Sequence, residues 1–181
     1  MKTGNNILSL VKLFPNYYLG AAYEFLILMH PNTISMTNKA LELNTTVKLV
    51  NNKLHFMGKA GDNAPVSIDY IAPLGDDSGY TSLELLLLSF SSCLGSAVLT
   101  FLRKMNKTIT GCEIIAKGFR HEDHPTGFKS ISVVIRVNSP DVSEADLQKV
   151  TSLAEDKYCP VWAMIKGNTV VNTAFEILKQ P

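Results

Sequence analysis

The longest uncharged stretch of the chain limits its fold more than any other feature. From Leu85 to Leu102 no side chain is charged, and apolar residues fall on every side of the helix that the stretch predicts. Such a helix either spans a membrane or lies in the centre of a core that covers it. Serine, threonine and glycine interrupt the stretch, and amphipathic strands follow it. We therefore favour a core helix. A membrane-associated protein, also suggested by apolar residues 17–29, remains the weaker alternative.

The remaining elements are predicted in groups. Strands are expected over residues 45–50, 54–57, 66–71, 113–119, 129–137 and 169–178, and helices over 82–105, 144–158 and a short segment after residue 159. Because strands cluster instead of alternating with helices, the sequence predicts an α+β fold with antiparallel sheets. We expect one domain over residues 36–181. Residues 1–35 are expected to be an N-terminal extension outside the fold, with Met36 as an alternative start.

Composition excludes several kinds of partner. The formal net charge is +1 and no block of like charge occurs, so we expect neither a nucleic acid nor an anionic membrane as partner. Three cysteines are too few for a disulfide scaffold. We expect a cytoplasmic protein with reduced thiols, in which any disulfide is transient and catalytic. The run from His121 to His124 is typical of a solvated loop, and no metal site is expected there.

The cysteines differ in their local settings. Cys93 lies within the uncharged stretch, where a cysteine is usually a small packed hydrophobe. Cys159 directly precedes Pro160, and proline favours the first position of a helix. Cys159 is therefore predicted to cap that helix. The free amides of the first turn would then favour its thiolate, although Cys159 can also serve as a cap alone. Cys112, at the start of a strand, is interpreted as structural.

Two charged residues are weaker candidates. Glu84 completes a capping box with Thr81, which by itself explains its presence. Arg120 opens the turn between two predicted strands and is, on local sequence alone, a surface residue. Trp162 and Met164 stand near Cys159 and either line a site for an apolar substrate or fill the core.

Three motifs carry a resemblance to a known family. They are Glu84-Leu-Leu-Leu-Leu-Ser-Phe-Ser-Ser-Cys93, Gly118-Phe-Arg-His121 and Lys157-Tyr-Cys-Pro-Val161. In this order they resemble the OsmC/Ohr family of osmotically inducible and organic hydroperoxide resistance proteins, and most closely its YhfA-like branch, over about residues 44–179. The resemblance implies the OsmC-like fold, an intertwined homodimer in which antiparallel sheets wrap around long central helices.

The resemblance also implies a chemistry. Cys93 would attack an organic hydroperoxide and become a sulfenic acid, and Cys159 would convert it into a disulfide. A dithiol such as dihydrolipoamide would reduce that disulfide, without a metal or organic cofactor. Family peroxidases support the thiolate with an arginine from the N-terminal strand region and a glutamate ten residues before the first cysteine. Residues 44–80 hold no arginine, and Leu83 occupies the glutamate position. Arg120 and Glu84 are therefore the candidates for these roles.

The departure from the family pattern keeps a second function open. In this alternative, the chain is an OsmC-fold protein that binds a small hydrophobic ligand or senses redox state, without efficient peroxidase activity.

Overall fold

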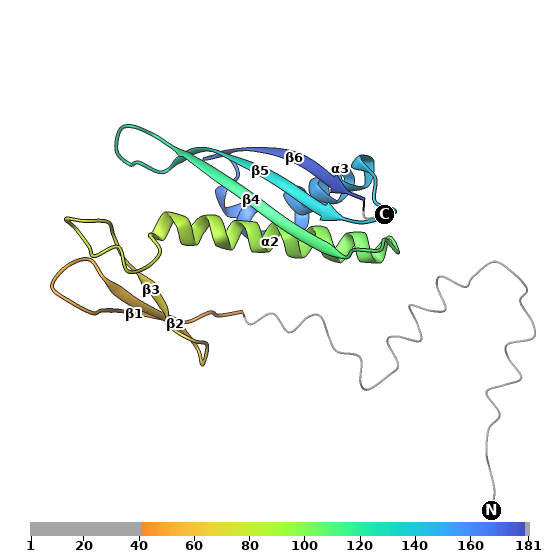
Figure 1. The fold of residues 1–181 in the computed structure, drawn as a ribbon. Helices are drawn as coiled ribbons and strands as arrows, with labels where there is room; N and C mark the ends of the chain where they lie inside the picture. The colour runs from red at the N-terminus through yellow and green to blue at the C-terminus, as the bar shows by residue number, and fades with distance from the viewer. Residues whose placement is uncertain (1–40, 180–181) are drawn as a thin grey trace, which may run out of the picture. The chain divides into compact units, whose positions relative to one another are not determined.

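The computed structural model describes residues 41–179, so the expectation for residues 1–35 lies outside the described residues. From Asn44 onward the described chain belongs to one compact unit. Figure 1 shows its elements: two three-stranded sheets, the long helix α2, and shorter helical segments near the C-terminus. This arrangement confirms the α+β class that the sequence predicts.

The first sheet is antiparallel, with strands β1 (Thr45–Leu49), β2 (Phe56–Ala60) and β3 (Val66–Ile68) in sequence order. The predicted hairpin is present, but β2 begins two residues later than expected and continues beyond Gly58. The turn is wider because the Val50 amide donates to the His55 carbonyl at 2.8 Å, while the Asn51 side chain accepts from the Lys53 amide.

The second sheet contains β4 (Gly111–Arg120), β5 (Phe128–Asn138) and β6 (Val170–Leu178). Strands β4 and β5 are antiparallel, whereas β6 runs parallel to β5. The expectation of purely antiparallel sheets is therefore wrong at this pair. Parallel strands need a crossover connection. Here it is made by α3 (Glu144–Leu153), a single π-helical turn η2 (Ala154–Tyr158) and α4 (Pro160–Ile165), which carry the chain back to the start of β5.

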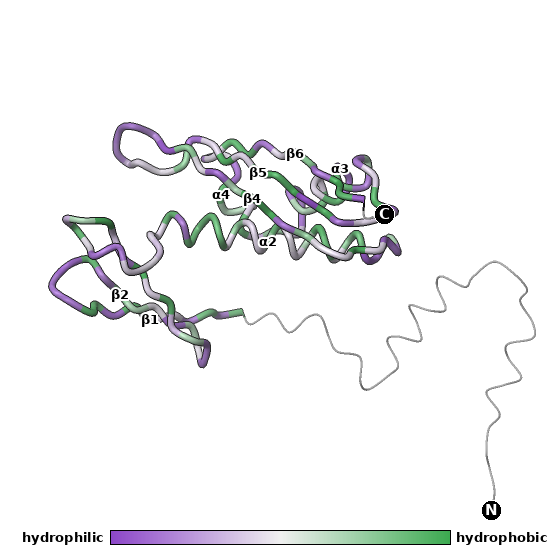
Figure 2. Tube along the Cα trace, viewed as in Figure 1, coloured by the Kyte–Doolittle hydropathy of each residue, from purple (hydrophilic) through white to green (hydrophobic). Residues whose placement is uncertain are grey.

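The core forms between this sheet and α2 (Ser82–Lys104). Every fourth residue of α2, from Phe90 to Leu102, is 0% exposed, as expected for one helical face. The alternating side chains of β5 from Ile131 to Val137 belong to the same cluster. Figure 2 shows this hydrophobic character along α2 and β5, and the hydrophilic β4–β5 hairpin loop.

The described chain covers only part of α2. Leu88, on the opposite side of the helix, is 51% exposed. Among the described helices, α2 alone is long and apolar enough to cross a membrane, a test that the core helix of a soluble protein also passes. Its buried face accounts for part of its apolar character, and the side that carries Leu88 is exposed.

Candidate active site

Cys93 is carried by the middle of α2, one residue before the buried Leu94. The capping box of Thr81 and Glu84 fixes where the helix begins, as the sequence predicts. Cys93 itself is half-buried at the margin of the core cluster. Its thiol is thus held by a regular helix, while part of the side chain stays accessible.

Cys159 is positioned by the π-helical turn before it and by the proline after it. The π-helical turn η2 ends with the Cys159 amide donating to the Ala154 carbonyl at 2.9 Å. Pro160 then disfavours helical geometry at the residue before it, and Cys159 has the extended values φ −104° and ψ 97°. Proline fits the first position of α4, so a new helix starts immediately. A π-helical turn is often found at functional positions.

The π-helical turn and Pro160 together place Cys159 in contact with Cys93. The Sγ atoms of the two residues are 2.7 Å apart, in direct contact. Both cysteines are free. The expectation that these residues meet is confirmed, although they are 66 positions apart in the sequence. The contact places a pair of sulfurs where a disulfide can form with a short local movement.

The surroundings of Cys159 oppose its ionisation. Its side chain is 1% exposed. Burial, followed by the hydrogen bond to Cys93, raises the pKa of the Cys159 thiol to about 12. The predicted cap is present, because the Cys159 sulfur accepts from the Trp162 amide at 3.4 Å. This amide lowers the pKa by less than burial raises it, which favours the alternative in which Cys159 serves as a cap alone over the one in which the cap supports a thiolate.

Aromatic side chains accompany the sulfur pair. Trp162 is buried and packs edge-on against Phe90, with ring centroids 5.4 Å apart. Tyr158 packs on Phe101 with a centroid separation of 4.5 Å. The core alternative for Trp162 is therefore confirmed. Met164 is 71% exposed, so the core interpretation is wrong for this residue.

Glu84 and Arg120 lie elsewhere. Glu84 precedes Cys93 by nine residues, which is about 13 Å along α2 and on the opposite face of the helix. Arg120 is exposed at the end of β4, where its guanidinium donates to the Thr126 carbonyl at 2.7 Å and also to the Thr126 hydroxyl. Within the described part of the chain, neither side chain forms a hydrogen bond or an ion pair with a cysteine.

Glu84 and Arg120 instead line a common pocket of about 640 Å³. Its walls come from the segment after β3, the start of α2 and the β4–β5 hairpin, and include Tyr70, Ile71, Leu74, Leu87, His124 and Phe128. Neither Cys93 nor Cys159 is among the lining residues. The candidate residues thus divide into a sulfur pair and a separate pocket with a mainly apolar lining.

A residue that was not predicted from the sequence, Asp69, organises one wall of this pocket. Asp69 is 1% exposed, and its carboxylate accepts from the backbone amides of Tyr70, Asp76 and Ser78. These three amides lower the pKa of Asp69 against the opposing effect of burial. The loop is also close-packed, since a Cβ on Gly75 would lie 2.0 Å from the Tyr70 carbonyl oxygen. An aspartate before a glycine-rich turn was the available signal.

Comparison with known proteins places this geometry in a family. A sequence model described as OsmC-like protein matches residues 75–174. Protein YhfA of Escherichia coli K12 is 22% identical over 125 residues, which cover 69% of this chain and 91% of YhfA. A hypothetical protein from Aquifex aeolicus has a TM-score of 0.69 and 26% identity, covering 78% of this chain and 100% of its own.

A further structural relative has a functional name. The organic hydroperoxide resistance protein OhrB of Bacillus subtilis has a TM-score of 0.55 and 20% identity, covering 75% of this chain and 98% of its own. At this identity the likeness concerns the fold. Since the family match spans more than half of the sequence and includes both cysteines, the chain belongs to the OsmC-like protein family.

Proposed function

We propose that the chain is a thiol-dependent peroxidase that reduces organic hydroperoxides through Cys93 and Cys159. The observation that carries the proposal is the contact between the two sulfurs, 2.7 Å apart and at the edge of an apolar core. Membership of a family with organic hydroperoxide resistance proteins among its structural relatives supports the same chemistry.

The first step uses Cys93, because its sulfur is the more accessible and Cys159 is held as a thiol. The Cys93 thiolate forms a bond with the outer peroxide oxygen while the O–O bond breaks. The alkoxide leaves and takes up a proton to become an alcohol. The peroxide is thereby reduced by two electrons, and Cys93 is oxidised to a sulfenic acid.

The second step closes the disulfide. The Cys159 sulfur bonds to the Cys93 sulfur, the S–O bond breaks, and hydroxide leaves as water with the proton of the Cys159 thiol. A dithiol such as dihydrolipoamide then reduces the disulfide by two exchange steps and is itself oxidised. A transient disulfide of this kind fits a cytoplasmic protein.

Titration with cumene hydroperoxide tests the proposal. The reduced protein should lose two of its three thiols, leave Cys112 free, and turn over with dihydrolipoamide. Cys93→Ser should consume no peroxide, whereas Cys159→Ser should react once and keep a sulfenic acid that dimedone traps. Cys112→Ser is the matched control and should behave as wild type. Sulfenic acid trapped on Cys159 in the Cys93→Ser protein would reverse the two roles.

The pocket lined by Glu84 and Arg120 favours a second candidate function. Its mainly apolar lining, which includes Arg120, suits a small hydrophobic ligand, whereas the cysteines that thiol chemistry needs do not reach it. If wild-type protein loses no thiols to peroxide, binding of such a ligand without turnover becomes the leading function.

We further propose that the protein acts as an intertwined homodimer. The five residues of β1 are all exposed, as is Leu88 on α2. Close to Leu88 on the helix surface are the small residues Ser89 and Ser92, which are exposed as well and would permit close approach of another helix. A second copy would cover these surfaces, in agreement with the family resemblance.

A further inference from the structure

We infer that the Cys159 thiol is also the hydrogen-bond donor that supports the Cys93 thiolate, in the place of the arginine that residues 44–80 lack. This role deepens the proposed function and rests on Cys93 being the attacking sulfur. It is distinct from disulfide formation, because it acts before any peroxide is bound.

The geometry supports a donor at this position. The Sγ atoms of Cys159 and Cys93 are 2.7 Å apart, so when the more accessible Cys93 loses its proton, the proton of the buried Cys159 thiol lies against the Cys93 sulfur. The Cys159 sulfur in turn accepts from the Trp162 amide, which holds the donor in place. With 1% of the side chain exposed, the thiol has little access to water as an alternative partner. A hydrogen bond to a charged acceptor is stronger than one to a neutral acceptor.

Charged groups on the neighbouring elements are engaged elsewhere. Lys166, directly after α4, pairs with Glu155 and Asp156 of η2, and the Lys157 ammonium lies over the Tyr158 ring. On α2, the Lys104 ammonium lies over Phe101.

The remaining ionisable groups of these elements are no closer partners. The charge of Arg103 lowers the pKa of Cys112, although burial raises it by more. The Glu84 carboxylate accepts from the Thr81 amide in the helix cap. Asp146 on α3 pairs with Lys107, and among the described residues neither Glu144 nor Lys149 forms a hydrogen bond with either sulfur. In the described part of the chain, the Cys159 thiol is therefore the one hydrogen-bond partner of the Cys93 sulfur.

The same proton also serves the later step. While Cys93 is a thiolate, the Cys159 proton is shared with it through the hydrogen bond. Once Cys93 carries a hydroxyl as sulfenic acid, the Cys159 proton leaves with that hydroxyl as water when the S–S bond forms. A thiol that resists ionisation thus keeps its proton until it can be used.

Alkylation by iodoacetamide without peroxide tests this role. In a Cys112→Ser background, the rate of Cys93 alkylation is measured against pH for the parent, Cys159→Ala and Cys159→Ser, with peptide mass spectrometry to assign the site. Neither variant can form the disulfide, but serine retains a donor. We expect Cys159→Ala to shift the midpoint of the profile upward by about one pH unit, a roughly tenfold loss of rate at neutral pH. Cys159→Ser should stay close to the parent.

The outcomes separate this inference from the proposed function. Equal midpoints in all three proteins overturn the donor role, as does a serine variant as slow as the alanine variant, which would indicate lost packing.

Circular dichroism checks folding. Should a variant not fold, the S–H Raman band of the Cys112→Ser protein decides: a band below the frequency of a free thiol supports the donor, and an unshifted band overturns it. A midpoint shift without peroxide turnover would retain the donor role and reject the peroxidase.

Discussion

The Glu84 carboxylate is occupied at the start of α2. Its Oε2 atom accepts from the Thr81 amide at 2.7 Å and from the Thr81 hydroxyl at 2.8 Å, and the Glu84 amide donates back to that hydroxyl. These bonds from Thr81 lower the pKa of Glu84. A carboxylate in this position stabilises the helix terminus, where free amides and the helix dipole favour negative charge.

We therefore predict that Glu84→Gln leaves the reactivity of Cys93 unchanged. Glutamine can complete a capping box, so most of the stability should be retained. Thr81→Ala is the matched control. It should lower the free energy of unfolding by about 1 kcal/mol through loss of the cap, also without an effect on the thiol. Urea unfolding and iodoacetamide kinetics measure the two properties. A large fall in Cys93 alkylation in a folded Glu84→Gln protein would place Glu84 in the active site.

At Cys159, the sequence predicts the local geometry but not the electrostatics. Pro160 is sufficient to predict the cap, because its effects on φ and on the preceding residue are local. The burial that raises the pKa of Cys159 comes largely from α2 and the core, which are remote in sequence. Local amides and remote burial act in opposite directions, and only the folded chain decides between them.

At the scale of elements, the alternation of β5 and the four-residue spacing on α2 make the main strands and helices predictable. The direction of β6 is not contained in such patterns, since a strand has the same alternation in either direction. The direction of β6 could have been predicted from the connection between β5 and β6. A helical crossover between two strands of one sheet is typical of a parallel pair, and the predicted helices after residue 144 formed such a crossover.

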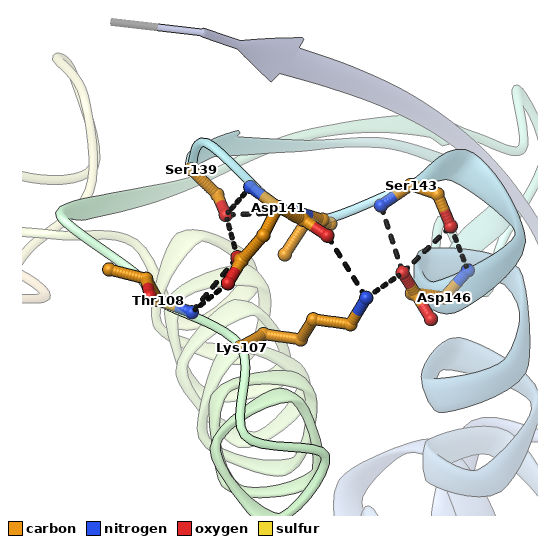
Figure 3. Close-up of polar contacts among 7 residues, drawn as sticks. Lys107, Thr108, Ser139, Asp141, Ser143 and Asp146 are labelled. Carbon is orange, nitrogen blue, oxygen red and sulfur yellow. Dashed lines mark hydrogen bonds and ion pairs between the residues drawn. The ribbon is translucent and has the colours of Figure 1, made fainter.

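Three elements are joined by the polar cluster in Figure 3. The Lys107 ammonium, just after α2, lies 2.8 Å from a carboxylate oxygen of Asp146 in α3 and donates to the Asp141 carbonyl. Asp141 follows β5 and accepts from the Thr108 amide. The side chains of Lys107 and Asp146 are only 23% and 16% exposed. The cluster therefore ties the end of α2 to the start of the crossover that delivers Cys159.

The pairing predicts a defined pH dependence. Lys107, followed by Ser143, lowers the pKa of Asp146 from 3.8 to about 2. Because the folded value is below the unfolded one, the charged carboxylate stabilises the fold above about pH 4, and this contribution is lost as the pH falls towards 2. The stability difference between wild type and Asp146→Asn should therefore be constant near neutral pH and shrink over that range.

Urea unfolding at several pH values measures the difference. Asp123→Asn, which removes an exposed carboxylate in the β4–β5 hairpin loop, is the control. A difference for Asp146→Asn that stays the same down to pH 2 would contradict the role of the ion pair.

At the scale of the whole molecule, the sequence could predict the family and the meeting of the two cysteines, but not the pocket. The motifs at Cys93 and Cys159 are continuous in sequence, so a resemblance can find them. The pocket draws its lining from three separated segments. Its construction depends on the Asp69 loop and on the way Arg120 braces the hairpin through Thr126, which are tertiary contacts.

The exposed side of α2 leads to a prediction for the assembly. Leu88 is 51% exposed in a single chain, so Leu88→Asp should cost little in the fold of one protomer. In the proposed dimer the same carboxylate would be buried without a partner, at a cost of several kcal/mol. We expect wild type to sediment as a dimer and Leu88→Asp as a monomer. Ile115→Asp, on the outer face of the second sheet and 40% exposed, is the matched control and should remain dimeric. A folded Leu88→Asp protein that still sediments as a dimer would show that this side of α2 is not the interface.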